Sequence, residues 1–160
     1  MKTICVTGSV GTGKTTLSKK LAKSLNYKYI DIHNLVKKYK LHESYDKKRS
    51  CYVVDTKTLN KFLIGLIKKS KKDLVLDSHL SHYLPKKYVD LCIVTKTNLN
   101  VLSKRLKKRK YSKEKIIMNL QAEIFQMCLT ESQFKKHNLL VVDTTKGYNL
   151  RNIVKQIKSI

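Results

Sequence analysis

The chain alternates between short apolar runs and longer amphipathic stretches. Each run is rich in leucine and β-branched residues, as buried parallel strands are. The runs cover residues 3–6, 29–30, 74–76, 91–94 and 139–142. The stretches between them carry apolar residues at helical spacing and cover residues 16–25, 59–67, 99–106, 116–134 and 150–157. This alternation predicts an α/β fold in which helices cover both faces of a parallel sheet through right-handed crossovers.

A glycine-rich loop follows the first apolar run. Residues 8–16 read GSVGTGKTT and match the pattern G-x-x-x-x-G-K-[ST] through Gly8, Gly13, Lys14 and Thr15. Small residues let the backbone close around an anion, to which its N–H groups and the dipole of the following helix are directed. Lys14 is expected to reach the β- and γ-phosphates of a nucleotide, and the Thr15 hydroxyl to hold Mg²⁺. The strand before the loop and the helix after it favour a phosphate loop over a plain glycine-rich turn.

A carboxylate follows the run at residues 74–76. Ligands of parallel α/β sheets bind at the carboxyl ends of the strands, so Asp77 is placed to orient Mg²⁺ through its water shell. The alternative for Asp77 is a helix cap or a turn. His79 is either a hydrogen-bond donor near a phosphate or a packed or solvated side chain. His82 shows nothing beyond an exposed turn.

Arginine is scarce in the chain, and two of the four arginines lie four residues apart. On a helix, Arg105 and Arg109 share one face. Near a phosphate loop, two guanidinium groups can neutralise a transferred phosphoryl group and exclude water, as a closing lid does. The alternatives are a basic run that binds RNA or directs localisation, and a solvated helix face.

Length and composition narrow the class of protein. A chain of 160 residues has the length of one domain, and no apolar run approaches the ~20 residues of a membrane span. The four cysteines are scattered without metal-ligand spacing, which favours reduced thiols. With no visible secretory signal, a cytoplasmic location is expected. The 35 basic and 11 acidic residues give a net charge of +24, which favours polyanionic partners unless it reflects a lysine-rich composition overall.

Five segments of the sequence together resemble the adenylate kinase isoenzyme 6 family. They read GSVGTGKTT, SYDKKRSCYVVD, DSHLSHYLP, RLKKRKYSKEKIIMNLQAEIF and VVDTT, in the order and spacing of that family, and they span nearly the whole chain. The most specific parts are the D-x-H after the third strand and the R-x-Y-S…K…N-x-x-A-E-I block, which ordinary adenylate kinases lack. The chain looks like an archaeal member, whose eukaryotic relatives act in the nucleus and in maturation of the small ribosomal subunit.

The resemblance implies one P-loop kinase domain over residues 1–160. Its parts would be a five-stranded parallel sheet, a nucleoside-monophosphate-binding segment near 31–55 and a short lid near 107–117. Residues 143–145 would lie beside adenine, although they are also a good helix cap. The residues implied to bind ATP are Gly8, Gly11, Thr12, Gly13, Lys14, Thr15, Thr16 and Arg109.

The resemblance also implies roles in catalysis. Asp77 and His79 would form a Walker-B-like pair, and Thr15 and Asp77 would hold Mg²⁺. Asn119 and Glu123 match the family, but no chemical role follows for them. The expected catalytic residues are Lys14, Asp77, His79, Arg105 and Arg109.

The chain departs from the family pattern at several positions. Ser9-Val10 replaces Thr-Pro in the phosphate loop, which should be tolerated because the backbone does the binding. Lys110 replaces a glycine and is expected to stiffen the lid hinge. An acidic stretch before residue 55 is replaced by Asp46 and the basic residues 47–49, so monophosphate preference does not transfer.

One arginine of ordinary adenylate kinases is also missing. No arginine follows the third strand to grip the acceptor phosphate. Arg49 could substitute, or Arg105 from the lid, although an exposed place among lysines is the commoner fate of a residue such as Arg49.

The resulting expectation is an Mg²⁺-dependent adenylate kinase that converts ATP and AMP to two ADP, with ATP hydrolysis as a side activity when the lid closes loosely. The main alternative is a ribosome-assembly ATPase whose ATP cycle drives binding to a small-subunit ribosomal protein or to rRNA, with incidental kinase activity. A kinase for another nucleotide or a metabolite hydroxyl is a weaker alternative, because a phosphate loop does not read the acceptor.

Overall fold

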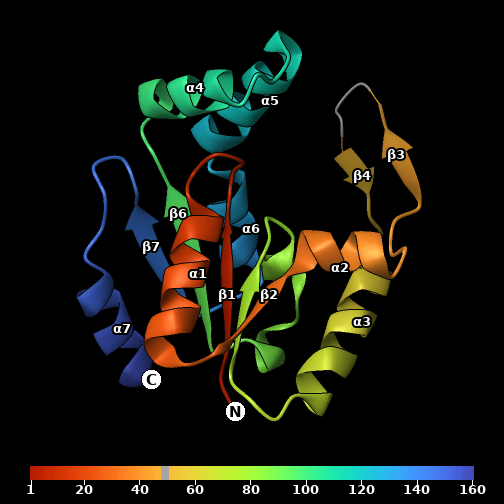
Figure 1. Ribbon diagram of the computed structural model, residues 1–160, viewed down its shortest axis with the longest axis vertical. Helices are drawn as coiled ribbons and strands as arrows, with labels where there is room; N and C mark the ends of the chain where they lie inside the picture. The colour runs from red at the N-terminus through yellow and green to blue at the C-terminus, as the bar shows by residue number, and fades with distance from the viewer. Residues whose placement is uncertain (48–50) are drawn as a thin grey trace.

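A five-stranded parallel sheet forms the centre of the protein in a computed structural model, which describes residues 1–47 and 51–160 (Figure 1). The strand order is β2-β5-β1-β6-β7, and every neighbouring pair is parallel. The strands are β1 (Thr3–Gly8), β2 (Lys28–Asp31), β5 (Leu74–Asp77), β6 (Leu91–Lys96) and β7 (Leu139–Asp143). Each contains one of the apolar runs, so the predicted α/β fold with a five-stranded parallel sheet is confirmed.

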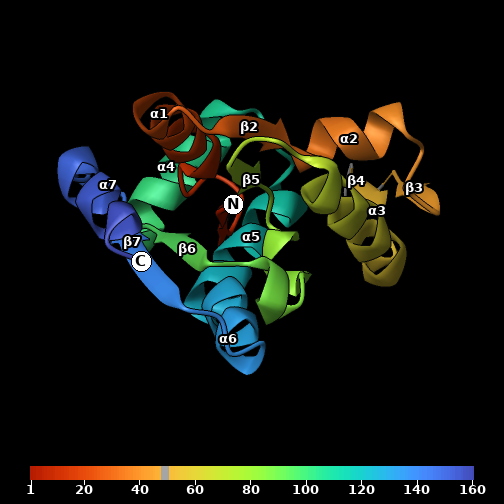
Figure 2. The same ribbon diagram turned by 90° about the horizontal axis from the view of Figure 1, so that it is seen from below.

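Helices cover both faces of the sheet (Figure 2). Successive residues of β1 point to opposite faces: Ile4 and Val6 pack with α1 (Lys14–Leu25) and α7 (Leu150–Lys158). Cys5 packs on the other side with α2 (Ile32–Lys38) and α3 (Thr56–Lys69). The two apolar layers leave the carboxyl ends of the strands as the place where polar groups gather.

Two segments stand beyond that end of the sheet (Figure 1). One is the turn between α4 (Leu99–Lys108) and α5 (Lys113–Ile124), where the sequence predicts a lid. The other is the antiparallel pair β3 (Ser44–Asp46) and β4 (Cys51–Val53), within the predicted monophosphate-binding segment. Two short 3₁₀ turns, Ser81–Tyr83 and Lys86–Tyr88, join β5 to β6. The interpretation of Arg49 falls outside the described residues.

The prediction of one helix over residues 116–134 is wrong. The first helix, α5, ends at its C-cap Phe125, because Gln126 adopts the left-handed conformation with φ 49°. A separate helix, α6 (Met127–Phe134), follows. The break lets α5 pack with α4 while α6 packs with β1 and β6. Both helices bury part of their surface, so the apolar spacing continues across the break and conceals it.

No helix among the described residues is long and apolar enough to cross a membrane.

Candidate nucleotide-binding site

The phosphate loop joins β1 to α1 and requires glycine at two close contacts. Gly8 has φ 138°, and a Cβ there would lie 2.4 Å from the Thr95 carbonyl oxygen. Gly11 has φ 90°, and its Cβ would lie 2.8 Å from the Leu102 side chain. L residues with side chains rarely adopt such φ values. The backbone of the loop therefore requires glycine at positions 8 and 11.

Several carbonyl groups of the loop are held by side chains from other elements. The Thr95 hydroxyl donates to the Thr7 carbonyl at 3.1 Å, and the Thr144 hydroxyl donates to the Thr12 carbonyl at 2.8 Å. Arg105 donates to the Gly11 carbonyl at 3.3 Å. Because N–H and C=O point in opposite directions across a peptide plane, fixing these carbonyls on one side turns the following N–H groups to the other. Such an arrangement suits an anion.

Lys14 begins α1 with its side chain folded along the loop. Its Nζ donates to the Ser9 carbonyl at 2.9 Å. Burial lowers the pKa of Lys14, and the Arg109 guanidinium lowers it further, whereas the Asp77 carboxylate opposes the shift. The Lys14 ammonium is thus held against the backbone of the loop. The Thr15 and Thr16 side chains are exposed.

Asp77 is the last residue of β5 and lies beside Val6 of β1 in the sheet register. Its carboxylate is buried and accepts a hydrogen bond from the Tyr29 hydroxyl at 2.8 Å. Burial raises the pKa of Tyr29, and the bond to Asp77 raises it further, so Tyr29 remains a donor. The sheet itself, rather than a helix cap, fixes this carboxylate on the Lys14 side of the strand ends.

His79 lies two residues beyond Asp77 with an exposed side chain. Atoms crowding the ring, and then the Lys14 ammonium, lower the pKa of His79. A neutral imidazole near Lys14 can donate one hydrogen bond and accept another.

The two arginines predicted for the lid have different surroundings. Arg105 lies on α4, and besides Gly11 its guanidinium binds the hydroxyl of Thr144 at 3.1 Å and the carbonyl of Thr144 at 2.9 Å. Arg109 caps the C-terminus of α4 and is exposed, yet its charge acts on Lys14. The structure thus holds Arg105 against the backbone and leaves Arg109 at the mouth of the site.

A cavity of about 550 Å³ lies where the loops after β6 and β7 meet. The Thr145 hydroxyl joins these loops by accepting from the Asn98 N–H at 2.9 Å. Asp143 accepts from the Thr145 N–H at 2.8 Å. The N-cap of α7 is Asn149 and not one of residues 143–145. The cavity is lined by Lys96, Thr97, Asn98, Asp143, Thr145, Lys146 and Gly147. Part of its wall is the loop at residues 143–145, which the family resemblance places beside adenine.

The predicted monophosphate-binding segment is built around aromatic rings. Asp31 caps α2 by accepting from the Asn34 N–H at 3.0 Å. The Tyr52 ring stacks on His42 with ring centroids 4.5 Å apart, and the His33 ring lies at 5.8 Å. The three rings thus pack against one another within the segment.

Comparisons with known proteins decide the family. A family model described as an AAA domain matches residues 4–126. A protein of Methanocaldococcus jannaschii that is named as an adenylate kinase is 42% identical over 96% of this chain and 82% of its own length. The adenylate kinase isoenzyme 6 homolog of Dictyostelium discoideum is 36% identical over 88% of this chain and 79% of its own length. The chain belongs to the adenylate kinase isoenzyme 6 family.

The family expected from the sequence, and the class of enzyme, a nucleotide kinase, are thereby confirmed. Solved structures show the same fold at low identity. A shikimate kinase of Acinetobacter baumannii superposes with a TM-score of 0.65 at 14% identity, over 99% of this chain and 92% of that one. The deoxyadenosine kinase of M. mycoides gives 0.57 at 16% identity, over 98% and 97%. This member of the adenylate kinase isoenzyme 6 family thus has a P-loop kinase fold.

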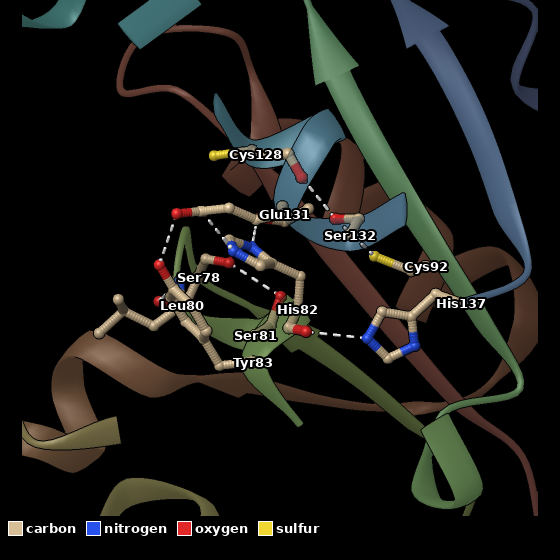
Figure 3. A network of polar contacts seen from close by, with 11 residues as sticks. Ser78, Leu80, Ser81, His82, Tyr83, Cys92, Cys128, Glu131, Ser132 and His137 are labelled. Atoms are coloured by element: carbon tan, nitrogen blue, oxygen red, sulfur yellow. Dashed lines mark hydrogen bonds and ion pairs between the residues drawn. The ribbon is translucent and has the colours of Figure 1, made fainter. Parts of the chain in front are cut away.

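One prediction within the family motif DSHLSHYLP is wrong: His82 is not in an exposed turn but is 1% exposed. It lies between Thr7 and Glu131, and Figure 3 shows the surrounding polar contacts. No local pattern indicated this, because the partners of His82 are 75 and 49 residues away along the chain.

Other polar residues of this family member acquire contacts that spacing did not reveal. Glu123 accepts from the Thr97 N–H at 3.0 Å and so ties α5 to the loop after β6. Asn119 donates to the Lys115 carbonyl at 2.7 Å within α5. Of the two residues that hold the phosphate loop, Thr95 directly follows an apolar run as Asp77 does, and Thr144 comes after Asp143, the polar residue that ends another run. The polar residue that ends a run is therefore the signal that could have found them.

Proposed function

We propose that the protein is a cytoplasmic adenylate kinase that transfers the γ-phosphoryl group of Mg²⁺-ATP to AMP and releases two ADP. The observation that carries the proposal is a phosphate loop whose carbonyls are held from behind, with the Lys14 ammonium on its Ser9 carbonyl and the buried Asp77 at the end of the neighbouring strand. Cations and N–H groups aimed at one place suit a chain of phosphates, which is rich in negative charge.

The residues present fit a magnesium nucleotide. Thr15 offers an exposed hydroxyl next to Lys14. Asp77 is a buried carboxylate that accepts a hydrogen bond from the Tyr29 hydroxyl. Hard oxygen ligands of this kind, in small number, are typical for Mg²⁺ bound together with a nucleotide. Mg²⁺ neutralises charge on the phosphate oxygens when it is bound there.

The reaction needs no covalent intermediate with the protein. An oxygen of the AMP phosphate attacks the γ-phosphorus, the new P–O bond forms as the bond to the β-phosphate oxygen breaks, and ADP carries away that electron pair. Lys14 moves from the Ser9 carbonyl to the phosphates and follows the charge that spreads over the γ-oxygens. Arg109 approaches from the lid, neutralises the same oxygens and excludes water.

Arg105 and His79 have supporting tasks in this proposal. Arg105 on α4 keeps the Gly11 and Thr144 carbonyls in place while the turn after α4 closes. His79, neutral because its pKa is lowered, donates a hydrogen bond to a phosphate oxygen or to bound water. The acceptor side rests on the segment near residues 31–55, where the rings of His33, His42 and Tyr52 lie.

The proposal is tested by nucleotide turnover. The purified protein is incubated with Mg²⁺-ATP, alone and with each nucleoside monophosphate in turn, and the products are separated by chromatography. With AMP, ADP should form at twice the rate of ATP loss, and Lys14→Ala should abolish this reaction. ATP hydrolysis to ADP and phosphate that is independent of AMP would contradict the proposal.

A second candidate function has its own supporting observation. No acidic residue occurs between Asp90 and Glu114, where α4 and the turn after it lie, whereas eight lysines and arginines do, so this stretch is purely basic. A ribosome-assembly ATPase would use such a surface on rRNA or beside a small-subunit ribosomal protein. Binding of these components that changes when ATP is added, measured over a range of salt concentrations, would support this function.

A further inference from the structure

A chain of polar contacts runs from Thr7, directly before the phosphate loop, through the buried His82 to Glu131 of α6. Figure 3 shows the contacts around His82 and Glu131. The His82 Nδ1 lies 2.8 Å from the Thr7 hydroxyl, and its Nε2 lies 2.9 Å from a carboxylate oxygen of Glu131. The Tyr83 hydroxyl donates to the other Glu131 oxygen at 2.9 Å. Thr7 and His82 are both essentially inaccessible to solvent.

The partners determine which way each hydrogen bond runs. An ionised carboxylate only accepts, so the Nε2 of His82 must carry the proton that is donated to Glu131. The Nδ1 of a neutral ring then accepts, and the Thr7 hydroxyl donates to it. The backbone of His82 is fixed as well, because its carbonyl accepts from the His137 ring at 2.8 Å. The hydrogen bonds from Thr7 through His82 to Glu131 thus have one consistent set of donors and acceptors.

Thr7 is the residue directly before Gly8. Its side chain is held by His82, while its carbonyl accepts from Thr95 at 3.1 Å. The peptide between Thr7 and Gly8 is therefore fixed from two sides at the point where the strand becomes the phosphate loop. A freed Thr7 side chain would loosen this peptide without touching the nucleotide.

The other end of the chain positions α6, which also contacts the loop. Burial raises the pKa of Cys128 in α6, and Lys14, the Thr7 hydroxyl and the Gly8 N–H oppose this shift. Cys128 and Gly8 also line one cavity. Glu131 lies one helical turn further along α6 and is tied to the 3₁₀ turn that follows Asp77 and His79. His82 thus joins three parts of the site: β1, α6 and the segment after β5.

We propose that His82 is a positioning residue for ATP binding, which acts through Thr7 on the start of the phosphate loop and through Glu131 on α6. The inference rests on the proposed binding of ATP at this loop. It assigns no direct contact with nucleotide to His82.

The test separates the hydrogen bond to the loop from general packing. Thr7→Val keeps the shape of the side chain and removes only the hydroxyl, whereas Thr7→Ser keeps the hydroxyl. Tyr83→Phe removes a bond to the same Glu131 at the far end from the loop, and serves as the matched control. The affinity of each full-length variant for Mg²⁺-ATP is measured by titration calorimetry, and its thermal stability in parallel.

Loss of one buried hydrogen bond at the loop should weaken ATP binding about five- to tenfold in Thr7→Val, in line with the cost of an unpaired buried acceptor. Thr7→Ser and Tyr83→Phe should bind Mg²⁺-ATP within about twofold of the wild-type affinity. This difference from Thr7→Val should persist even if Tyr83→Phe and Thr7→Val melt at the same temperature. His82→Gln keeps a hydrogen-bond donor toward Glu131 but loses the contact to Thr7. Its affinity for Mg²⁺-ATP should therefore resemble that of Thr7→Val.

The outcomes are distinct. Equal ATP affinity in Thr7→Val and Tyr83→Phe would overturn the inference and leave the proposed function standing. A wild-type protein that binds no Mg²⁺-ATP would overturn both. Turnover of AMP need not be observed for either conclusion.

Discussion

Arg105 and Arg109 show how two like residues on one helix can serve different ends. Four positions apart, they were expected to share one face and one task. Arg105 instead has its guanidinium on the carbonyls of Gly11 and Thr144, while Arg109 is exposed beyond the end of α4. Sequence spacing predicts that two side chains share a face, but not how many acceptors each will meet there.

Exchanging the two arginines for alanine should therefore give different results. In Arg109→Ala, we expect kcat to fall about a hundredfold or more with an unchanged melting temperature, because an exposed charge that acts in the transition state is lost. In Arg105→Ala, the melting temperature should fall and KM for ATP should rise, since backbone carbonyls lose their donor. Steady-state kinetics and thermal melts of both variants test this, and identical behaviour would contradict it.

Lys110 occupies a backbone conformation that suits glycine. Its φ is 56°, where a side chain costs about 1 kcal/mol. Lys110→Gly should therefore raise the free energy of unfolding by up to about that amount. Lys104→Gly, at an exposed position in the middle of α4, is the matched control and should lower it by about 1 kcal/mol. Chemical denaturation measures both, and a loss of stability in Lys110→Gly would show that the lysine side chain makes a compensating contact.

At the scale of elements, the five strands were the most predictable part of the fold. Buried parallel strands need apolar residues on both faces, and each apolar run in the sequence predicted one strand. The pair β3 and β4 has neither burial nor alternation, since four of its six residues are exposed, and the sequence could not indicate it. His82 was missed for another reason: the chain pattern carries no information about a partner such as Glu131 that only folding brings near.

The packing of α6 through His82 should depend on pH. Burial lowers the pKa of His82, partly offset by Glu131, while the nearby charges of His137 and Lys135 lower it further. The unfolded chain therefore binds this proton more tightly than the folded one. Stability should be fully present above pH ~6.5, the ordinary pKa of histidine, and should fall as the pH drops below it.

Thermal melts between pH 7.5 and pH 5 check this expectation. The melting temperature of the wild type should decline toward pH 5, and that of His82→Gln, which has no ring to protonate at this position, should decline less. Parallel curves for the two proteins would assign the pH dependence to other groups.

The whole molecule carries far more positive than negative charge, with 35 basic and 11 acidic residues. The family, the fold and the phosphate loop were all accessible from sequence, because each rests on local patterns. What this charge is for was not, because lysines occur along the whole chain and no pattern separates a binding surface from a solvated one. Charge acts over distances that a motif does not describe.

Binding to RNA should therefore be strong at low salt and largely indifferent to sequence. Between 50 and 200 mM salt, the affinity for an unstructured RNA should fall by about a thousandfold or more if six or more phosphates are contacted. Fluorescence anisotropy with two unrelated RNA sequences measures this. An affinity that survives high salt for only one of the sequences would instead indicate specific recognition.

The bonds from Arg105 to Gly11 and Thr144 also limit how this enzyme can be recombined with its relatives. Helix α4 carries the donor, whereas the two carbonyls belong to segments far away in the chain. A chimera that takes α4 from another kinase inherits a phosphate loop shaped for a guanidinium that the new helix must also supply. The unit of exchange is therefore α4 together with both backbone segments it holds, and a boundary drawn at the ends of α4 would cut through it.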